Sequence, residues 1–265
     1  MNRVLLMVAS TIAVAALVVC VATGQAKKPE KRQYVETETG RWLIHDTNRP
    51  APPIITPGTE CGAAPSDAIV LFDGTQESME KNWKPTKWIC QDGYMESVKK
   101  AGYISTAKDF GSCQFHVEFA TPSKVQGSSQ GRGNSGVFLH GQYEVQVLDS
   151  YDNKTYPDGQ CAALYGRAVP LANACRKPGE WQSYDIVYHR PLFDKDGKVT
   201  RKATFTILQN GVLVQDHVEL EGGTGWDGPH AITDYRPHPD KGPIQLQDHG
   251  NPVRYRNIWI RELKD

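Results

Sequence analysis

Short segments with alternating apolar and polar residues recur along the chain after about residue 67. The clearest is Gln114–Ala120, in which Phe115, Val117 and Phe119 alternate with His116 and Glu118. Because successive side chains of a strand point to opposite faces, this pattern predicts a strand with one buried face. The other predicted strands are 68–72, 88–90, 94–98, 136–139, 143–148, 181–189, 203–208, 212–218, 244–247 and 254–263.

Turn residues separate these segments. Gln91-Asp92-Gly93 and Asn210-Gly211 stand between neighbouring strand segments and are typical of tight hairpins. No long amphipathic helix pattern and no internal repeat occurs in this part of the chain. The pattern therefore predicts an all-β fold in which two antiparallel sheets pack face to face as a β-sandwich.

The first residues have the pattern of a signal peptide rather than of a folded domain. Met1–Arg3 carry positive charge, Val4–Val21 are mostly apolar, and Gly24-Gln25-Ala26 offer small residues for cleavage. We expect residues 1–26 to be removed, and the protein to be exported with no stable membrane partner. The alternative is a retained transmembrane anchor, because the apolar run approaches the ~20 residues that span a bilayer. Bulky Val19 disfavours lipidation of Cys20.

Residues 27–66 are expected to form a proline-rich linker or N-terminal arm. They begin with a basic run at 27–32 and continue with Pro50, Pro52, Pro53 and Pro57. Proline removes backbone donors and stiffens an extended chain, which suits a spacer better than a core. Residues 67–265 then form a single sandwich domain, of a size that one core can support.

Charge and cysteine content narrow the picture further. The 30 basic residues balance 30 acidic ones, so nothing indicates the basic face that nucleic acid requires. Export permits disulfides, and we expect the pairs Cys90–Cys113 and Cys161–Cys175, with Cys61 left as an odd thiol. No closely spaced cysteine pair indicates a structural zinc site.

The polar positions of the strands favour groups that both donate and accept hydrogen bonds. If the apolar residues mark the core side, these positions gather on the outer face of one sheet. Sugar hydroxyls need such groups, because each hydroxyl offers one donor and two acceptors. The set predicts a carbohydrate ligand, and it contains His116, Glu118, Glu144, Gln146, Gln245 and Gln247, with Asp185 and His189 less clearly.

Several of these residues allow two interpretations. Glu118 and Glu144 are either two solvent-facing acids or a carboxylate pair of the kind that cleaves glycosidic bonds. His116 is either an exposed strand histidine or a base or metal ligand. His249, where a strand runs into a turn, is a candidate to line the site. Asn134, in the turn 131–136, either fixes that turn or contacts the ligand.

Aromatic residues in loops add to the binding hypothesis. Trp226 follows Gly222-Gly223-Thr224-Gly225, and a tryptophan on such a loop suits stacking on a sugar ring. The other tryptophans have apolar neighbours and are expected in the core. The segment 149–180 is long and irregular and contains three tyrosines, which is typical of a functional loop. A serine hydrolase is disfavoured, because the chain has no Gly-x-Ser-x-Gly elbow.

Six motifs along the chain resemble, in the same order, motifs of the 3-keto-disaccharide hydrolase family, which was formerly described as a domain of unknown function. The resemblance runs from about Ala68 to Leu263 and covers nearly the whole predicted domain. It rests on LFDG at 71–74, GRGNSGVFLHGQYEVQVLDS at 131–150, TYPDGQ at 155–160, RKPGEWQSYDIVYHRP at 176–191, NGVLVQDHVELEG at 210–222 and LQDHGNPVRYRNIWIREL at 246–263.

The resemblance implies a jelly-roll sandwich of the concanavalin type, with a ligand groove on its concave sheet. It also implies action on glycosides that carry a ketone at sugar carbon 3. Such a ketone acidifies the hydrogen on carbon 2, so that a base can form an enolate, the group on carbon 1 departs, and water adds to the enone. In this scheme Glu144 or His116 is the base and Glu118 the acid.

The same scheme assigns binding roles and leaves alternatives open. Gln146, Gln247 and His249 would position the substrate, with Asn134, Asp185 and Trp226 as further contacts. A divalent metal could stabilise the enolate oxygen, although no ligand spacing in the sequence requires one. A non-catalytic lectin domain is the alternative function, because a fold of this kind does not fix activity. A cell-surface scaffold is a third.

Overall fold

The computed structural model describes residues 34–37, 40–43, 60–224 and 234–265. The chain divides into two compact units, residues 1–53 and 54–265. In the first unit, β1 (Tyr34–Thr37) pairs antiparallel with β2 (Gly40–Leu43), a hairpin that the sequence analysis did not predict. The expected signal peptide at 1–26 lies outside the described residues, as does most of the expected arm.

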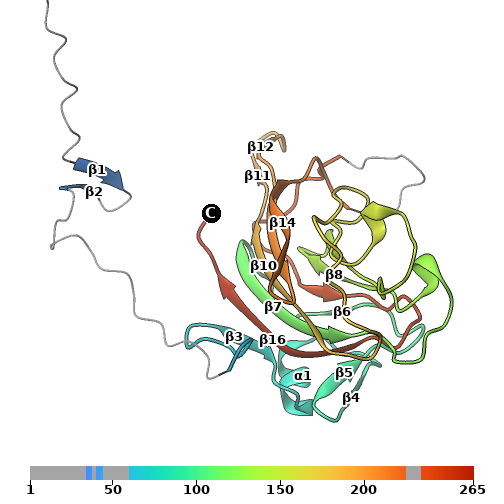
Figure 1. The fold of residues 1–265 in the computed structure, drawn as a ribbon. Coiled ribbons are helices and arrows are strands. Elements are labelled where there is room, and N and C mark those ends of the chain that lie inside the picture. The colour runs from blue at the N-terminus through green and yellow to red at the C-terminus, as the bar shows by residue number, and fades with distance from the viewer. Residues whose placement is uncertain (1–33, 38–39, 44–59, 225–233) are drawn as a thin grey trace, which may run out of the picture. The chain divides into compact units, whose positions relative to one another are not determined.

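The second unit contains a large antiparallel sheet in the strand order β14-β13-β10-β7-β16-β5-β4 (Figure 1). β3 also pairs with β16, beside β5. The strands are β3 (Ile69–Phe72), β4 (Ile89–Gln91), β5 (Tyr94–Glu96), β7 (Cys113–Ala120), β10 (Gln182–His189), β13 (Thr204–Gln209), β14 (Val212–Glu219) and β16 (Arg254–Glu262).

A smaller sheet has the order β6-β15-β8-β9. Its strands are β6 (Ile104–Ser105), β8 (Ser135–Leu139), β9 (Tyr143–Val147) and β15 (Gln245–Leu246). A separate pair, β11 (Leu192–Phe193) and β12 (Val199–Arg201), follows β10. One short helix, α1 (Gln76–Asn82), follows β3 and is capped by the Thr75 hydroxyl, and two 3₁₀ turns occupy Ser129–Gly131 and Pro157–Gly159.

The two sheets enclose a single core. Phe115, Val117 and Phe119 of β7 are fully buried, as the alternation predicted, and they share the core with Val137 of β8 and Val145 of β9. The all-β sandwich prediction is therefore confirmed. Each strand predicted from alternation is present within a few residues of its predicted bounds, whereas α1, β6, β11 and β12 were not predicted.

Both predicted hairpin turns form. Asp92 and Gly93 have φ of 48° and 78°, and Asn210 and Gly211 have φ of 52° and 81°. Two consecutive residues with positive φ match the right-handed twist of the strands that they join. Asn, Asp and Gly tolerate this conformation, which is why these dipeptides identify the turns.

The cysteine pairing expected from the sequence is not found, and all five described cysteines are free thiols. Cys90 and Cys113 are too far apart to pair. The register from β4 through β5 and β16 to β7 places Cys90 level with Phe119, and Cys113 lies six residues from Phe119 along β7, a distance of about 20 Å. Cys161 and Cys175 do lie together, and the Gln209 amide nitrogen is 3.5 and 3.4 Å from their two sulfurs.

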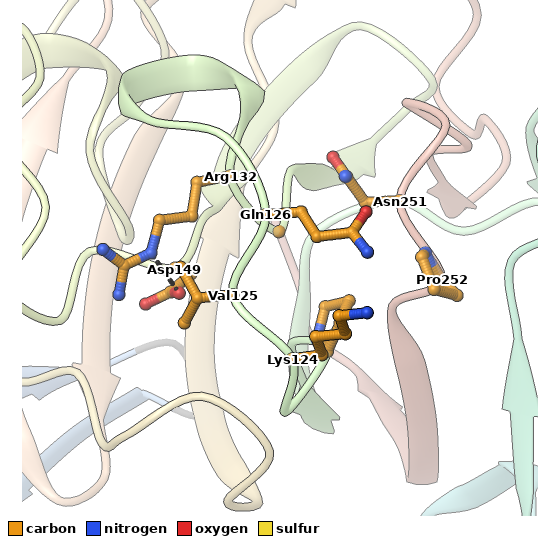
Figure 2. A pocket seen from close by; sticks show the side chains of 9 residues that line it. Lys124, Val125, Gln126, Arg132, Asp149, Asn251 and Pro252 are labelled. Atoms are coloured by element: carbon orange, nitrogen blue, oxygen red, sulfur yellow. Dashed lines mark hydrogen bonds and ion pairs between the residues drawn. The ribbon is translucent and has the colours of Figure 1, made fainter.

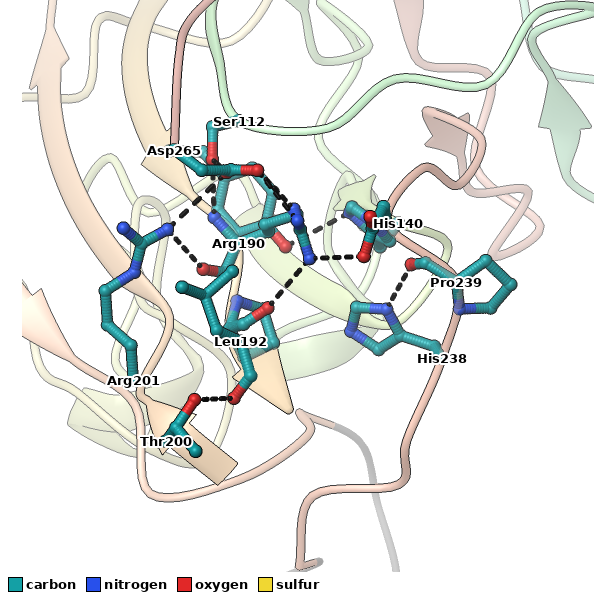
Figure 3. Close-up of polar contacts among 12 residues, drawn as sticks. Ser112, His140, Arg190, Leu192, Thr200, Arg201, His238, Pro239 and Asp265 are labelled. Atoms are coloured by element: carbon teal, nitrogen blue, oxygen red, sulfur yellow. Dashed lines mark hydrogen bonds and ion pairs between the residues drawn. The ribbon is translucent and has the colours of Figure 1, made fainter. Parts of the chain in front are cut away.

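Side chains hold Asp265 next to the residue that follows β10 and the residue that precedes β7 (Figure 3). The Asp265 carboxylate accepts hydrogen bonds from Arg190 Nε and from the Ser112 hydroxyl. Arg190 also forms an ion pair with Asp240, at 2.8 Å. Within the described residues, no helix is long and apolar enough to cross a membrane.

Candidate active site

The candidate site begins on the face of the small sheet that points away from the core. In the β8–β9 register, Phe138 stands opposite Glu144, and Gly136 stands opposite Gln146. Val137 and Val145, between them, face the core. Alternation in β9 therefore places Glu144 and Gln146 side by side on the outer face, as the sequence predicted.

The next strand extends this face. The main-chain N–H of Gln247 donates to the Gly136 carbonyl, and the Gln247 amide nitrogen donates to the Tyr103 hydroxyl at 2.6 Å. Tyr103 in turn packs against Phe138, with ring centroids 5.3 Å apart. Gln247 and Tyr103 thus stand beside Gly136 and Phe138 and widen the polar surface around Glu144.

Loops cover this face and turn it into a cavity of ≈ 240 Å³. The segment that follows β9 folds back so that Ala162 N–H donates to the Gln146 carbonyl and Gln146 N–H donates to the Ala163 carbonyl, which pairs the outer edge of β9. The cavity is lined by Tyr103, Gln130, Asn134, Phe138, Glu144, Gln146, Tyr165, Gln247 and His249. Tyr165 comes from the long 149–180 segment, whose length had indicated a functional loop.

Glu144 is the acidic residue of this cavity. Its side chain is 5% exposed, and no described residue donates a hydrogen bond to its carboxyl group. Burial without a compensating cation penalises the charged form and raises the pKa of Glu144 to about 8. The carboxyl lies against the bare α-carbon of Gly136, where an added β-carbon would overlap Glu144 Oε1. Glu144 is therefore protonated at neutral pH and close to the point of ionisation.

Two amide oxygens in the cavity have unused hydrogen-bonding capacity. The Gln146 amide nitrogen donates to Gln130 Oε1 and to the Gly159 carbonyl, and this fixes the amide so that Gln146 Oε1 points away from these partners. Gln146 Oε1 and Gln247 Oε1 are both buried and accept no hydrogen bond from the described residues. An unpaired buried acceptor is costly, so a ligand with hydroxyl donors would satisfy both atoms.

The charge of the cavity limits its ligands. Among the described residues, no lysine or arginine lines it. Phosphate or carboxylate ligands require cations or clustered N–H donors, which are not provided here. The cavity therefore favours an uncharged, hydroxyl-rich ligand.

Arg132 holds the glycine-rich turn, residues 131–136, which lies beside the cavity. Figure 2 shows the Arg132 guanidinium directed at the Asp149 carboxylate, in a smaller cavity that Lys124 also lines. Arg132 further donates to the Tyr151 and Asp152 carbonyls. Asn134 donates to the Gln130 carbonyl at 2.7 Å while its side chain borders the cavity, so it both fixes the turn and lines the site.

His116, Glu118 and Asp185 do not lie on the same face as Glu144, so the prediction that these residues share one face is wrong. His116 and Glu118 belong to β7 and Asp185 to β10, both in the large sheet, whereas Glu144 belongs to the small sheet. Outward-facing residues of the two sheets of a sandwich lie on opposite sides of the core. Glu118 and Glu144 therefore do not form a carboxylate pair.

The large-sheet group has its own electrostatics. His116 Nδ1 lies 2.7 Å from Asp185 Oδ1. Burial lowers the pKa of His116, but hydrogen bonds and charge from Asp185 and Glu118 outweigh it and raise the pKa to about 8. Burial raises the pKa of Glu118, yet hydrogen bonds from His116, Asn257 and Arg256 outweigh it and hold the pKa at about 2. This group is a charged network separate from the cavity.

Other expected site residues have mixed outcomes. Gln247, His249, Asn134, Glu144 and Gln146 come together around the cavity, with His249 exposed at its rim. Trp226 lies outside the described residues. Asp248, the neighbour of His249, accepts from the main chain at Gly102 and Gly250. The cavity residues missed from the sequence are Tyr103, Gln130 and Phe138, and no alternation pattern identifies the first two because they lie outside strands.

The described residues contain no group of three or more His, Cys, Asp or Glu side chains arranged to hold a metal ion. The cavity itself offers one carboxyl group and one imidazole, from Glu144 and His249.

Comparisons with known proteins agree on the family. A family model described as a 3-keto-alpha-glucoside-1,2-lyase-like domain matches residues 67–261. A curated relative, the 3-keto-disaccharide hydrolase of Bacteroides thetaiotaomicron, is 24% identical over 240 residues, which cover 74% of this chain and 78% of the relative.

Solved structures from Parabacteroides distasonis share the fold. A crystal structure described as a "putative glycosyl hydrolase" is 45% identical, with a TM-score of 0.77, and the match covers 83% of this chain and 97% of that chain. A second structure with the same description is 22% identical with a TM-score of 0.54, over 80% of this chain and 100% of that chain, and it supports the fold alone.

Proposed function

The chain belongs to the 3-keto-alpha-glucoside-1,2-lyase-like family and is a carbohydrate-active hydrolase, and from this premise we propose that it cleaves glycosides that carry a ketone at sugar carbon 3. The observation that carries the proposal is the cavity around Glu144, where one buried carboxyl group stands beside two unpaired amide oxygens. The leader-like sequence of residues 1–26 adds export to this proposal.

Glu144 is the group that moves the proton from carbon 2. A ketone at carbon 3 acidifies this hydrogen, so a weak base can remove it. With a pKa of about 8, Glu144 is a stronger base than an ordinary carboxylate once it ionises. The pair of roles that the sequence analysis gave to His116 and Glu118 does not fit this cavity, because neither residue lines it.

The remaining roles can be filled by other residues of the cavity. The Tyr103 hydroxyl accepts from Gln247, so its own proton is free to stabilise the enolate oxygen that forms at carbon 3. Burial raises the pKa of Tyr103, which keeps that proton in place. The His249 imidazole at the rim can protonate the oxygen that departs from carbon 1.

This chemistry accounts for both the lyase in the family's description and the hydrolase in the name of the curated relative. Removal of the carbon 2 proton and loss of the carbon 1 substituent is an elimination, the reaction of a lyase. Addition of water to the resulting enone completes a net hydrolysis. Gln146 Oε1 and Gln247 Oε1 hold the sugar hydroxyls through both steps.

Replacement of Glu144 by glutamine tests the proposal. We expect Glu144→Gln to lower turnover of a 3-keto-glucoside by roughly 10²–10⁴-fold while substrate binding persists, because the amide keeps the shape but cannot accept the proton. Glu118→Gln is the matched control, since it makes the same change outside the cavity and should leave turnover unchanged. Product analysis measures both the free 3-keto sugar and the enone.

Two results would contradict the proposal. An unchanged rate for Glu144→Gln would remove Glu144 from the reaction. Binding of the 3-keto-glucoside by the unaltered protein without any product would instead favour the lectin function.

A further inference from the structure

A second and larger cavity, ≈ 470 Å³, lies on the outer face of the large sheet. Its volume falls in the usual range for small-molecule sites, which is about 300–1,000 Å³. None of the residues that line it takes part in the chemistry proposed above. They are Cys61, Gly62, His116, Glu118, Arg176, Trp181, Gln182, Ser183, Asp185, Asn210, Gly211 and Arg256.

The floor of this cavity consists of two rows of side chains that cross β10, β7 and β16. In the first row, Ser183 stands opposite Glu118, which stands opposite Arg256. In the second row, Asp185 stands opposite His116, which stands opposite Trp259, a residue that packs on the His116 ring and does not itself line the cavity. All six residues occupy outward positions, so the register of three strands fixes their spacing.

Polar contacts hold this floor rigid. The His116 ring stacks on Trp259 with centroids 5.1 Å apart and an interplanar angle of 11°. The Gly62 carbonyl accepts hydrogen bonds from Trp259 Nε1 and from the Asn257 amide. These bonds hold the backbone at Gly62 against the His116 ring, which is 2% exposed. His116 is therefore not an accessible base, and its function here is to hold the Asp185 carboxylate in place.

Several groups around the floor keep unused hydrogen-bonding capacity. Asp185 uses Oδ1 for His116, while its Oδ2 has no partner among the described residues, and its side chain is 39% exposed. The Ser183 hydroxyl and the Trp181 indole N–H also have no hydrogen-bond partner among the described residues. The Asp185 oxygen can accept a hydrogen bond, the Trp181 N–H can donate one, and the Ser183 hydroxyl can do both.

The aromatic ring is also fixed in position. The Arg256 guanidinium lies 4.1 Å from the centroid of the Trp181 ring, and Glu118 Oε2 accepts from Arg256 Nε at 2.7 Å. Arg256 and His116 are paired with Glu118 and Asp185, so among the described lining residues the exposed Arg176 is the one whose charge no ion pair balances. Arg256 and Arg254 both lie over the Trp181 ring, which leaves its N–H as the group for a ligand, and the unpaired oxygen of Asp185 accepts from a hydroxyl but repels an anion. The cavity beside Asp185 therefore suits a neutral ligand with hydroxyl groups.

We propose that this outer cavity is a second binding site for an uncharged saccharide, in which Asp185, Ser183 and Trp181 contact the sugar. It lies on the opposite side of the core from Glu144 and needs no ketone at carbon 3. It is independent of the proposed reaction, so the failure of one leaves the other intact.

The test uses cellobiose and maltose, disaccharides without a carbon 3 ketone, and the indole N–H resonance of Trp181 in the full chain. Trp181→Phe assigns this resonance by its disappearance. We expect a saturable shift on titration, and a loss of affinity of about tenfold or more in Ser183→Tyr, in which the larger ring fills the cavity while the hydrogen bonds at this position, which use the Ser183 main chain, are kept. Glu144→Gln should leave the titration unchanged.

Three outcomes would overturn this proposal. The first is the absence of a saturable shift at Trp181 with either sugar. The second is a shift in both Ser183→Tyr and Asp185→Ala with the same midpoint as in the unaltered protein, when circular dichroism shows both variants to be folded. The third is saturation by inorganic phosphate alone, which would make the cavity an anion site. Turnover of a 3-keto-glucoside by Ser183→Tyr should match that of the unaltered protein.

Discussion

At the scale of single residues, the chemistry of the candidate active site depends on one buried carboxyl group without a cation. Burial raises the pKa of Glu144, and no arginine or lysine among the described residues of the cavity offsets it. At Glu118, hydrogen bonds from His116, Asn257 and Arg256 outweigh burial and lower the pKa. Two glutamates on outward strand positions thus have opposite protonation states at neutral pH. The difference comes from the deeper burial of Glu144 and from the hydrogen-bond partners of Glu118.

The absence of a side chain at Gly136 is a second requirement of the site, and it leads to a prediction. Gly136→Ala should lower turnover by about tenfold or more, because the new methyl group would occupy the space of the Glu144 carboxyl and displace it from the substrate. Gly136 does not have positive φ, so alanine fits the backbone and the protein should still fold. Steady-state kinetics and the thermal unfolding midpoint together measure the effect.

Gly131→Ala is the control for this substitution. Gly131 also lacks positive φ, and an added β-carbon there would meet no atom within 4 Å. Equal turnover of the two variants would show that the position of Glu144 does not depend on Gly136.

At the scale of elements, alternation predicts which side chains of a strand face outward but not which sheet the strand joins. His116 in β7 and Glu144 in β9 have the same local pattern, and only the pairing of β7 with β10 and β16 separates them. Loop residues such as Gln130 and Tyr165 follow no periodic pattern. The longer strands of both sheets and two hairpin turns could therefore be predicted from sequence, whereas the short strands β6, β11 and β12 and the assignment of polar residues to two separate sites could not.

The glycine-rich turn provides a prediction at this scale. Arg132→Ala should lower the free energy of unfolding by about 3 kcal/mol, because it leaves the buried Asp149 carboxylate without its cation. It should also weaken substrate binding, since the same turn carries Gln130 and Asn134 into the cavity. Urea unfolding and KM measure the two effects.

Lys124→Ala is the matched control for Arg132→Ala. Lys124 borders the same small cavity (Figure 2) but is exposed, and its removal should change stability by less than about 0.5 kcal/mol. A similar loss in both variants would contradict the importance of the Arg132–Asp149 pair.

At the scale of the whole molecule, a buried histidine links the two sheets. His140 occupies the tight turn between β8 and β9, and its Nδ1 lies 3.1 Å from the Tyr188 hydroxyl of β10 in the other sheet. His238 lies beside it, with ring centroids 4.4 Å apart, and Arg190 is also close (Figure 3). The Tyr143 ring lies 6.4 Å from His140, centroid to centroid. Burial, with the charges of His238 and Arg190, lowers the pKa of His140 to about 4.

This pKa predicts a loss of stability in acid. The unfolded chain binds a proton on His140 below about pH 6.5, whereas the folded protein does so only near pH 4, so the stabilisation is present above pH 6.5 and is lost as the pH falls towards 4. In His140→Asn, the decrease in unfolding free energy between pH 7 and pH 4.5 should be smaller by about 2 kcal/mol. Asparagine tolerates the positive φ of 56° at this position. Parallel pH profiles of the two proteins, by urea unfolding, would contradict this assignment.

The pairing of β9 with Ala162 and Ala163 has a consequence for solubility. β9 is the last strand of the small sheet, and without this pairing its free N–H and C=O groups could recruit a strand from another molecule. The 149–180 segment covers that edge with its own backbone and also supplies Tyr165 to the cavity. Sequence changes that loosen this segment to admit larger sugars would therefore also expose an edge prone to aggregation, which limits how far the specificity of the enzyme can drift.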